Sequence, residues 1–216
     1  MESPIKPLLI LGARNFAPEV ADVASKMPGF KVVGFVENYE PERCQEKLEG
    51  LPVHWVEDIA LFADSYWAIC GLGSTLRSHF IEQVASYGFL FGKIIHPSAI
   101  ISSKSSVGDG TFVSAGAIIA SYTNIGCHVI INRGALIGHH IKIGDYVTIG
   151  PGVNIGSKCH IGKSTYIGIG AVVLDHISIG SHSVVGAGAV VTKDVPDHVQ
   201  VVGIPAKIVK ENITGK

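Results

Sequence analysis

From Ile95 to Val191, every sixth residue of the sequence is isoleucine or valine, and no insertion breaks this register. Glycine usually follows the aliphatic residue, and the residue four places after it is small or β-branched. The α-helix repeats every 3.6 residues and the β-strand every two, so neither a helix nor one long strand explains a period of six. Each hexad must therefore combine a short strand with a corner.

One aliphatic side chain per hexad is expected to point inward and to stack on its counterparts in neighbouring coils. A glycine such as Gly150 is expected at the bend, where a side chain would crowd the backbone. This pattern resembles the hexapeptide-repeat acyltransferases, whose chain winds as a left-handed parallel β-helix with three hexads per coil. On that basis the sixteen steps of six form a little over five coils. A purely structural solenoid is the alternative interpretation.

The amino-terminal part of the sequence has a different pattern. Strands are expected at residues 8–13, 31–38 and 66–73, and helices at 18–27 and 74–88. Strands that alternate with helices predict a small parallel sheet of Rossmann type. The predicted fold class is therefore α/β plus β, with a Rossmann-like domain followed by a β-helix.

Two strand-to-helix turns in this part are candidate ligand sites, "GARNFAPE" and "CGLGSTLR". Each ends where a helix is expected to begin, so its free amide groups and the helix dipole favour a phosphate. Neither is a complete G-x-G-x-x-G, so the pattern disfavours a nicotinamide cofactor, and simple tight turns remain the alternative.

The order of a small α/β domain, a hexapeptide β-helix and then "VPDHVQVVGIPAK" resembles the sialic acid O-acetyltransferase and bacillosamine-type N-acetyltransferase family. That family acetylates sugars, many of them nucleotide-linked, with acetyl-CoA. The resemblance implies a nucleotide-sugar-binding domain at 1–92, an acyltransferase β-helix at 93–195 and a carboxy-terminal extension at 196–216. It also implies a homotrimer with acetyl-CoA in the groove between adjacent subunits.

Members of this family carry N-T-x-A-V-I-D/E-H-D/E-C-x-I-G in the middle of the β-helix, where this chain has "NRGALIGHHIKIG". The resemblance places His139 at the catalytic base, while His140 and Gly138 stand where acidic residues are usual. Neutral imidazole, with a pKa of about 6.5, can accept the proton that an attacking amine or hydroxyl loses. Without the usual carboxylate, His139 must be oriented by Asp145, a main-chain carbonyl, another subunit or water.

The resemblance assigns further residues by role. Those expected to contact the nucleotide sugar are Arg14, Asn15, Phe16, Glu37, Asn38, Gly71 and Gly73, with Phe16 in the place of the usual histidine. Those expected to lie along acetyl-CoA are Thr148, Ile169 and Ala187. Asn132 is expected to place the substrate near the base, although an asparagine ladder inside the β-helix is the alternative.

Composition excludes several other classes of function. The formal net charge is −1 and no basic cluster occurs, which argues against nucleic acid and anionic membranes as partners. The apolar run "PLLILGA" is too short to span a bilayer, so no membrane span is expected. The four cysteines lack C-x-x-C spacing, which predicts neither disulfides nor a zinc site. We therefore expect a cytoplasmic protein without a metal.

The leading functional hypothesis is an acetyl-CoA-dependent N-acetyltransferase. It would act on a nucleotide-linked amino-deoxy sugar, at a 4-amino group, during synthesis of a bacterial surface glycan. O-acetylation of a sialic-acid-like sugar is the alternative within the same family. A trimeric binding protein without catalysis is the alternative from another class, because the acidic partner of the histidine is missing. A metal enzyme of the γ-carbonic-anhydrase type shares the β-helix, but its histidine spacing and its lack of the first domain argue against it.

Overall fold

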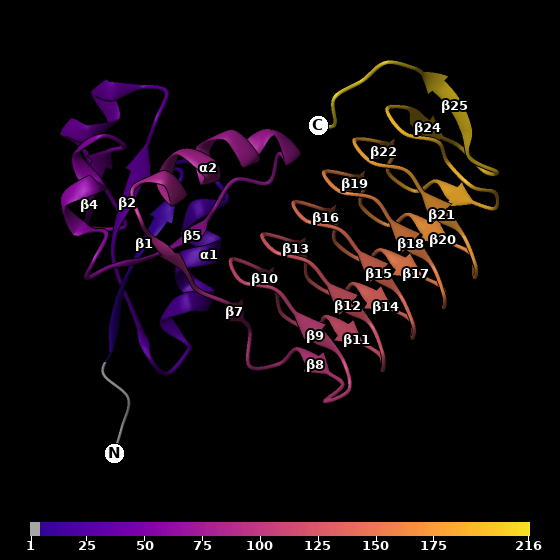
Figure 1. The fold of residues 1–216 in the computed structure, drawn as a ribbon, viewed down its shortest axis with the longest axis horizontal. Coiled ribbons are helices and arrows are strands. Elements are labelled where there is room, and N and C mark those ends of the chain that lie inside the picture. The colour runs from indigo at the N-terminus through magenta and orange to yellow at the C-terminus, as the bar shows by residue number, and fades with distance from the viewer. Residues whose placement is uncertain (1–4) are drawn as a thin grey trace. The chain divides into compact units, whose positions relative to one another are not determined.

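The computed structural model describes residues 5–216, which form two compact units (Figure 1). The first unit runs to Gly73 and also contains Arg77–Pro97. The second unit contains Ser74–Leu76 and Ser98–Lys216. No helix among the described residues is long and apolar enough to cross a membrane.

The first unit is built on a six-stranded sheet with the order β3-β4-β2-β1-β5-β6. Its strands are β1 (Lys6–Leu11), β2 (Phe30–Glu37), β3 (Lys47–Leu48), β4 (Leu51–Trp55), β5 (Trp67–Cys70) and β6 (Leu90–Phe91). The helices along this part of the chain are α1 (Ala17–Ser25) and α2 (Ser78–Ser86), with short 3-10 turns η1 (Pro41–Gln45), η2 (Asp58–Phe62) and η3 (Thr75–Arg77). Strand β1 pairs in parallel with both β2 and β5.

The Rossmann-type expectation is confirmed. Leu8–Leu11 on β1 are fully buried, as is usual for a central strand of a parallel sheet that is covered on both faces. Strands β3, β4 and β6 were not predicted, because two of them have two residues each and β4 contains Pro52. Apart from the antiparallel β3–β4 pair, every pairing in this sheet is parallel.

The repeat region forms two-residue strands, and β7 (Ile94–Ile95) precedes those of the second unit. They are β8 (Ile100–Ile101), β9 (Ser106–Val107), β10 (Phe112–Val113), β11 (Ile118–Ile119), β12 (Asn124–Ile125), β13 (Ile130–Ile131), β14 (Leu136–Ile137), β15 (Lys142–Ile143), β16 (Thr148–Ile149), β17 (Asn154–Ile155), β18 (His160–Ile161), β19 (Tyr166–Ile167), β20 (Val172–Val173), β21 (Ser178–Ile179), β22 (Val184–Val185) and β23 (Val190–Val191). Strand β24 (Gln200–Val202) pairs in parallel with β22, and β25 (Lys207–Lys210) returns antiparallel to β24.

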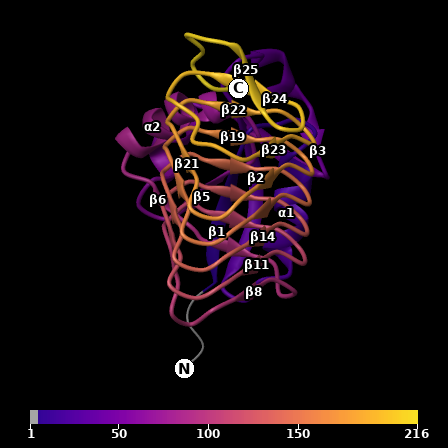
Figure 2. The ribbon, with the colours of Figure 1, turned by 90° about the vertical axis from the view of Figure 1, so that its right-hand side faces the viewer.

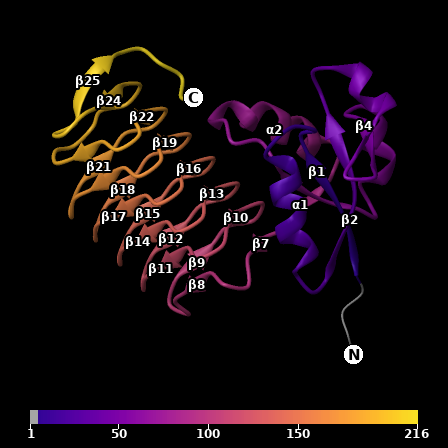
Figure 3. The same ribbon diagram turned by 180° about the vertical axis from the view of Figure 1, so that it is seen from behind.

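These strands belong to three parallel sheets, one on each side of the coil. From β7 to β20, each strand pairs with the third strand after it, so Ile119 lies beside Ile137 and Ile137 lies beside Ile155. One coil therefore takes three hexads, and Figures 2 and 3 show the coils stacked in order along the chain. The predicted left-handed β-helix is confirmed.

The inside of the β-helix is held by two kinds of side chain. The hexad isoleucines and valines are buried from Ile119 onward. At the corners, small polar side chains satisfy the backbone between coils: Thr123 Oγ1 donates to the carbonyl of Gly138 (2.8 Å) and accepts from the Ile141 amide (3.2 Å). The Gly138 carbonyl and the Ile141 amide are therefore both hydrogen-bonded at this corner.

The bend after β16 has no room for a side chain, as expected. A Cβ atom on Gly150 would stand 2.8 Å from both the Ile167 carbonyl oxygen and the Ile169 amide nitrogen of the next coil. These are backbone atoms and cannot rotate away. Glycine at this position therefore follows from the spacing of the coils.

Candidate functional site

The first unit has a cavity of about 210 Å³ at the carboxyl ends of β1, β2 and β5. Its lining residues are Gly12, Ala13, Arg14, Glu37, Asn38, Tyr39 and Leu72. In the sheet order these three strands are neighbours. Strands β2, β4 and β3 lie on one side of β1, and β5 and β6 lie on the other, so the order in which strands are added reverses at β1. Crevices at such reversals are the usual ligand sites of open α/β sheets. Three residues predicted from sequence, Arg14, Glu37 and Asn38, are brought together here.

Glu37 shapes the wall of this cavity. Its side chain is 3% exposed, and Oε1 accepts hydrogen bonds from the amides of Asn38 (3.1 Å), Tyr39 (2.9 Å) and Glu40 (3.4 Å). The carboxylate thus holds the turn that follows β2 and presents Asn38 and Tyr39 to the cavity. Tyr39 was missed in the sequence because no motif marks it.

Arg14 also borders a second hollow, of about 360 Å³, together with Asn15 and Arg43. Arg14 Nη2 lies 2.6 Å from Glu40 Oε1, and Arg43 pairs with the other carboxylate oxygen of Glu40. Hydrogen bonds from Arg43 and then from Arg14 hold the pKa of Glu40 below its usual value. Both arginines border this hollow, where the N–H groups not used by Glu40 are suited to phosphate oxygens. Arg43 lies far from Arg14 in the chain, so sequence spacing did not reveal it.

The other predicted nucleotide-sugar residues have different settings. Phe16 is the N-cap residue of α1 and is half-buried. Gly71 is buried, and a Cβ there would stand 2.8 Å from Ala17 Cα, so packing against α1 already requires glycine. Gly73 has open space around it. The role of these three residues in binding stays a prediction.

His139 lies on the β-helix corner that follows β14, and its side chain is exposed. Its Nδ1 atom is 2.9 Å from Nδ1 of His140, and the two rings meet edge to face with centroids 5.0 Å apart. The His140 backbone has a φ of 59°, in the left-handed region. The two histidines therefore form a hydrogen-bonded pair at the surface.

Asp145, one of the partners considered for His139, belongs to the next corner along the chain. Its Oδ1 accepts the Cys127 amide at 2.7 Å, a backbone hydrogen bond between adjacent coils. Asp175 and Asp197 make the same kind of bond to Ser157 and Ser181. The Asp145 carboxylate therefore stabilises the stacking of adjacent coils. The ring that contacts His139 is that of His140.

Asn132 directly follows β13 and is buried. Its Nδ2 donates to the carbonyl of Ile149 in the next coil at 3.2 Å, and its backbone amide donates to the same oxygen at 3.0 Å. The side chain thus bridges two coils, as the asparagine-ladder alternative expects. A role in placing substrate stays a prediction.

The predicted acetyl-CoA residues fall into two groups. Ile169 and Ala187 occupy the same corner in successive coils and are exposed, and the Gly188 amide donates to the Ile169 carbonyl. Thr148 lies in β16, one coil before the strand that leads to Ile169, and its side chain is 2% exposed. Ile169 and Ala187 could contact a cofactor through side chain and backbone, whereas the Thr148 side chain is covered in this structure.

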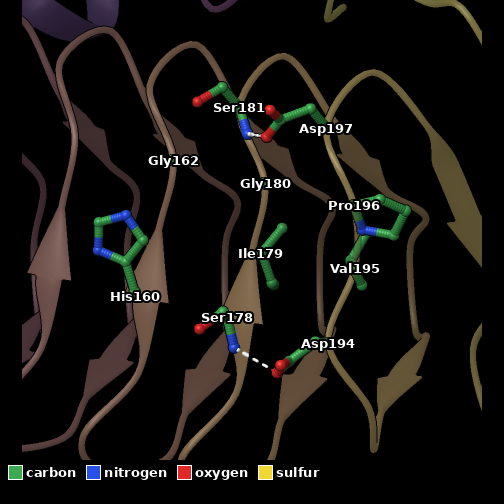
Figure 4. Close-up of a pocket in the computed structure, with 10 residues that line it drawn as sticks. All are labelled: His160, Gly162, Ser178, Ile179, Gly180, Ser181, Asp194, Val195, Pro196 and Asp197. Atoms are coloured by element: carbon green, nitrogen blue, oxygen red, sulfur yellow. Dashed lines mark hydrogen bonds between the residues drawn. The ribbon is translucent and has the colours of Figure 1, made fainter.

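A groove of about 540 Å³ lies on the β18–β21 side of the β-helix, and Figure 4 shows its lining. Asp194 accepts the Ser178 amide (2.8 Å) and Asp197 accepts the Ser181 amide (2.6 Å), so both carboxylates are used within the coils. None of the predicted site residues lines it. Among residues 5–216, no group of three or more histidine, cysteine, aspartate or glutamate side chains is placed to hold a metal ion.

Comparison with known proteins bears on both units. The sequence model of one protein family, described as bacterial transferase hexapeptide (six repeats), matches residues 122–157 and 158–193. No curated protein sequence matches this one closely enough to be called a relative.

Solved structures match the chain over nearly its whole length. A mutant of perosamine N-acetyltransferase from Caulobacter crescentus, in complex with CoA and GDP-perosamine, is 28% identical with a TM-score of 0.89, over 96% of this chain and 98% of that one. The acetyltransferase domain of PglB from Neisseria gonorrhoeae, in complex with acetyl coenzyme A, is 28% identical with a TM-score of 0.88, over 95% and 100%. WeeI from Acinetobacter baumannii is 27% identical with a TM-score of 0.85, over 96% and 100%.

Proposed function

We propose that this chain is a hexapeptide-repeat acyltransferase that transfers acetyl from acetyl-CoA to the amino group of a nucleotide-linked amino-deoxy sugar. The observation that carries this proposal is the match of both units, over 96% of the chain, to an enzyme solved with CoA and GDP-perosamine. An exposed histidine pair on the β-helix supplies a base, and the cavity in the first unit supplies a ligand site. The reaction is a step toward a bacterial surface glycan.

The proposed chemistry needs one base and one leaving group. The sugar nitrogen attacks the thioester carbonyl, a C–N bond forms, and the C–S bond breaks to release CoA. The nitrogen must lose a proton as the tetrahedral intermediate forms, and Nε2 of His139 accepts it, because Nδ1 is engaged with His140. The proton then passes to the departing thiolate.

The nucleotide is proposed to lie in the cavity beside Arg14, Glu37 and Asn38. Arg14 and Arg43 are suited to its phosphates, and Asn38 and Tyr39 offer polar and stacking contacts for its base or ribose. A 4-amino position on the sugar is proposed from the family resemblance, and GDP-perosamine is the nucleotide-linked sugar bound in the matched structure.

A panel of acceptors tests this function. With acetyl-CoA and a thiol-detecting reagent, we expect CoA release with a nucleotide-linked amino sugar, GDP-perosamine being the first probe. We expect none with a matched sugar that carries hydroxyl in place of the amine. Release only with hydroxyl acceptors would favour the O-acetyltransferase. Binding of acetyl-CoA without turnover of any acceptor would favour the non-catalytic binding protein.

We also propose that the chain works as a homotrimer, with acetyl-CoA held between subunits and in contact with Ile169 and Ala187. The outward side chains of β8, β11 and β14 are apolar and exposed, with Ile100 at 63% and Leu136 at 42%. Burying such a row against a second copy removes it from water. Light scattering should give three times the chain mass at working concentration. A monomer would contradict a site shared between subunits.

A cytoplasmic location is proposed from the cysteines. Cys44, Cys70, Cys127 and Cys159 are all free thiols. Burial raises the pKa of Cys70 to about 11 and also raises that of Cys159, which keeps both in the thiol form. Free thiols persist in a reducing compartment.

A further inference from the structure

We propose that His140 is a positioning residue that accepts the hydrogen of His139 Nδ1–H and so leaves Nε2 of His139 unprotonated. The effect of His140 on catalysis rests on the proposed function, whereas the hydrogen bond between the two rings does not. It gives His140 a part in the reaction although it stands where relatives have an acidic side chain.

The geometry restricts how the two rings can share a proton. The two Nδ1 atoms are 2.9 Å apart, which is hydrogen-bond distance, and only one of them can carry the hydrogen between them. If His140 donates, neutral His139 must carry its own hydrogen on Nε2 and cannot accept another there. If His139 donates, its Nε2 lone pair is available. Only the second arrangement lets Nε2 act as a base.

The same hydrogen bond strengthens as the reaction proceeds. When Nε2 takes the proton from the sugar amine, His139 becomes imidazolium and its Nδ1–H becomes a charged donor to neutral His140. Charge-assisted hydrogen bonds are roughly twice as strong as neutral ones. His140 therefore stabilises the protonated base through its acceptor atom, without the negative charge that a carboxylate would add.

The β-helix holds His140 in place from both sides. Its amide donates to the Ser121 carbonyl (3.1 Å) in the preceding coil, and the Lys158 amide in the following coil donates to the His139 carbonyl (2.9 Å). The His140 ring packs on Tyr122, with centroids 4.8 Å apart. The backbone at this position is therefore held by both adjoining coils, and the His140 ring packs on the preceding one.

The charged and titratable groups at this corner are limited. In the preceding coil this group is Tyr122. One coil further back lies Lys104, whose Nζ donates to the Tyr122 hydroxyl at 3.1 Å. In the following coil, Ser157 and Lys158 take the places of His139 and His140. Asp175, two coils after His139 at the same corner, places its Oδ1 on the Ser157 amide (2.5 Å). Among the described residues, the positions of His139 and His140 in the two adjoining coils carry no acidic residue.

Three substitutions at one position separate the acceptor from the rest of the side chain. Asparagine and aspartate both place an oxygen where histidine has Nδ1, whereas glycine has no acceptor. All three tolerate the φ of 59° at this position better than alanine does. His140→Gly thus removes the acceptor without a new strain, and His140→Asn is its matched control.

We expect His140→Gly to lower kcat by roughly 10- to 100-fold, the size of effect seen for partners that orient metal-bound histidines. The KM for acetyl-CoA should stay unchanged. His140→Asn should retain most of kcat. His140→Asp should retain it too and move the acid limb of the kcat profile to higher pH, because a carboxylate raises the pKa of a neighbouring imidazole. Equal kcat values for the glycine and asparagine variants would overturn the proposal.

Nitrogen-15 NMR of histidine-labelled protein reads the same hydrogen bond without any substrate. We expect His139 to carry its hydrogen on Nδ1 in the unsubstituted protein and in His140→Asn, and on Nε2 in His140→Gly. This pattern in a protein that acetylates no sugar would support the positioning role and reject the proposed function alone. Hydrogen on Nε2 of His139 in the unsubstituted protein would overturn the positioning role, whatever the activity.

Discussion

Replacement of His139 by alanine is expected to lower turnover by roughly 10²- to 10⁴-fold, the range for loss of a general base. Acetyl-CoA affinity and trimer formation should remain nearly intact, because the His139 side chain is exposed and its ring hydrogen-bonds to that of His140. His140→Ala should cost much less, since His140 touches the base and not the sugar nitrogen. Steady-state kinetics with acetyl-CoA and the nucleotide-linked amino sugar measures both variants.

His160→Ala is the matched control for that loss. His160 is also an exposed histidine of the β-helix, and it lies on a strand of a different side of the coil. Its removal should leave turnover unchanged. If His139→Ala keeps near-full activity and the acid limb of the rate profile does not move, the proton leaves by another route. The amine would then bind already neutral, with water or the departing thiolate taking its proton.

Gly150→Ile is expected to lower the free energy of unfolding by about 3 kcal/mol or more, at the upper end of the usual cost of overpacking. The reason is that its Cβ would stand 2.8 Å from backbone atoms of the next coil, which cannot rotate away. Thermal unfolding followed by circular dichroism should show the drop. The kcat per folded molecule should change less than the stability does, because His139 lies on a different corner.

Gly152→Asn provides the comparison two residues away. Gly152 has a φ of +63°, which asparagine tolerates, and a Cβ there meets nothing within 4 Å. Its melting temperature should stay close to that of the unsubstituted protein. An unchanged melting temperature for Gly150→Ile as well would mean that the register of the hexads is wrong.

The β-helix followed from the sequence because one period specifies both of its requirements. The sixth residue gives the inward side chain, as at Ile137, and the next residue gives the bend, as at Gly138. The first unit was harder, because β3 and β6 are two residues long and carry no periodic signal. Its strands β1, β2 and β5, which are longer apolar runs, were predicted.

The candidate site was predictable only where local sequence decides the position. Arg14, Glu37 and Asn38 follow directly after strands whose carboxyl ends meet, so they share one cavity. Arg43 joins Arg14 through the pairing of both with Glu40, a contact set by the path of the η1 turn. The partner of His139 was missed because the direction of the His140 ring depends on its left-handed backbone and on Tyr122 in the preceding coil.

Acetyl-CoA labelled with carbon-13 in its acetyl group tests the central claim most directly. After incubation with the protein and GDP-perosamine, mass spectrometry and carbon-13 NMR should find the label on the sugar as an amide that resists hydroxylamine. Omitting the protein, or using His139→Ala, should leave the label on CoA. A labelled ester that hydroxylamine cleaves, or label that stays on CoA with every nucleotide-linked amino sugar tried, would contradict the account.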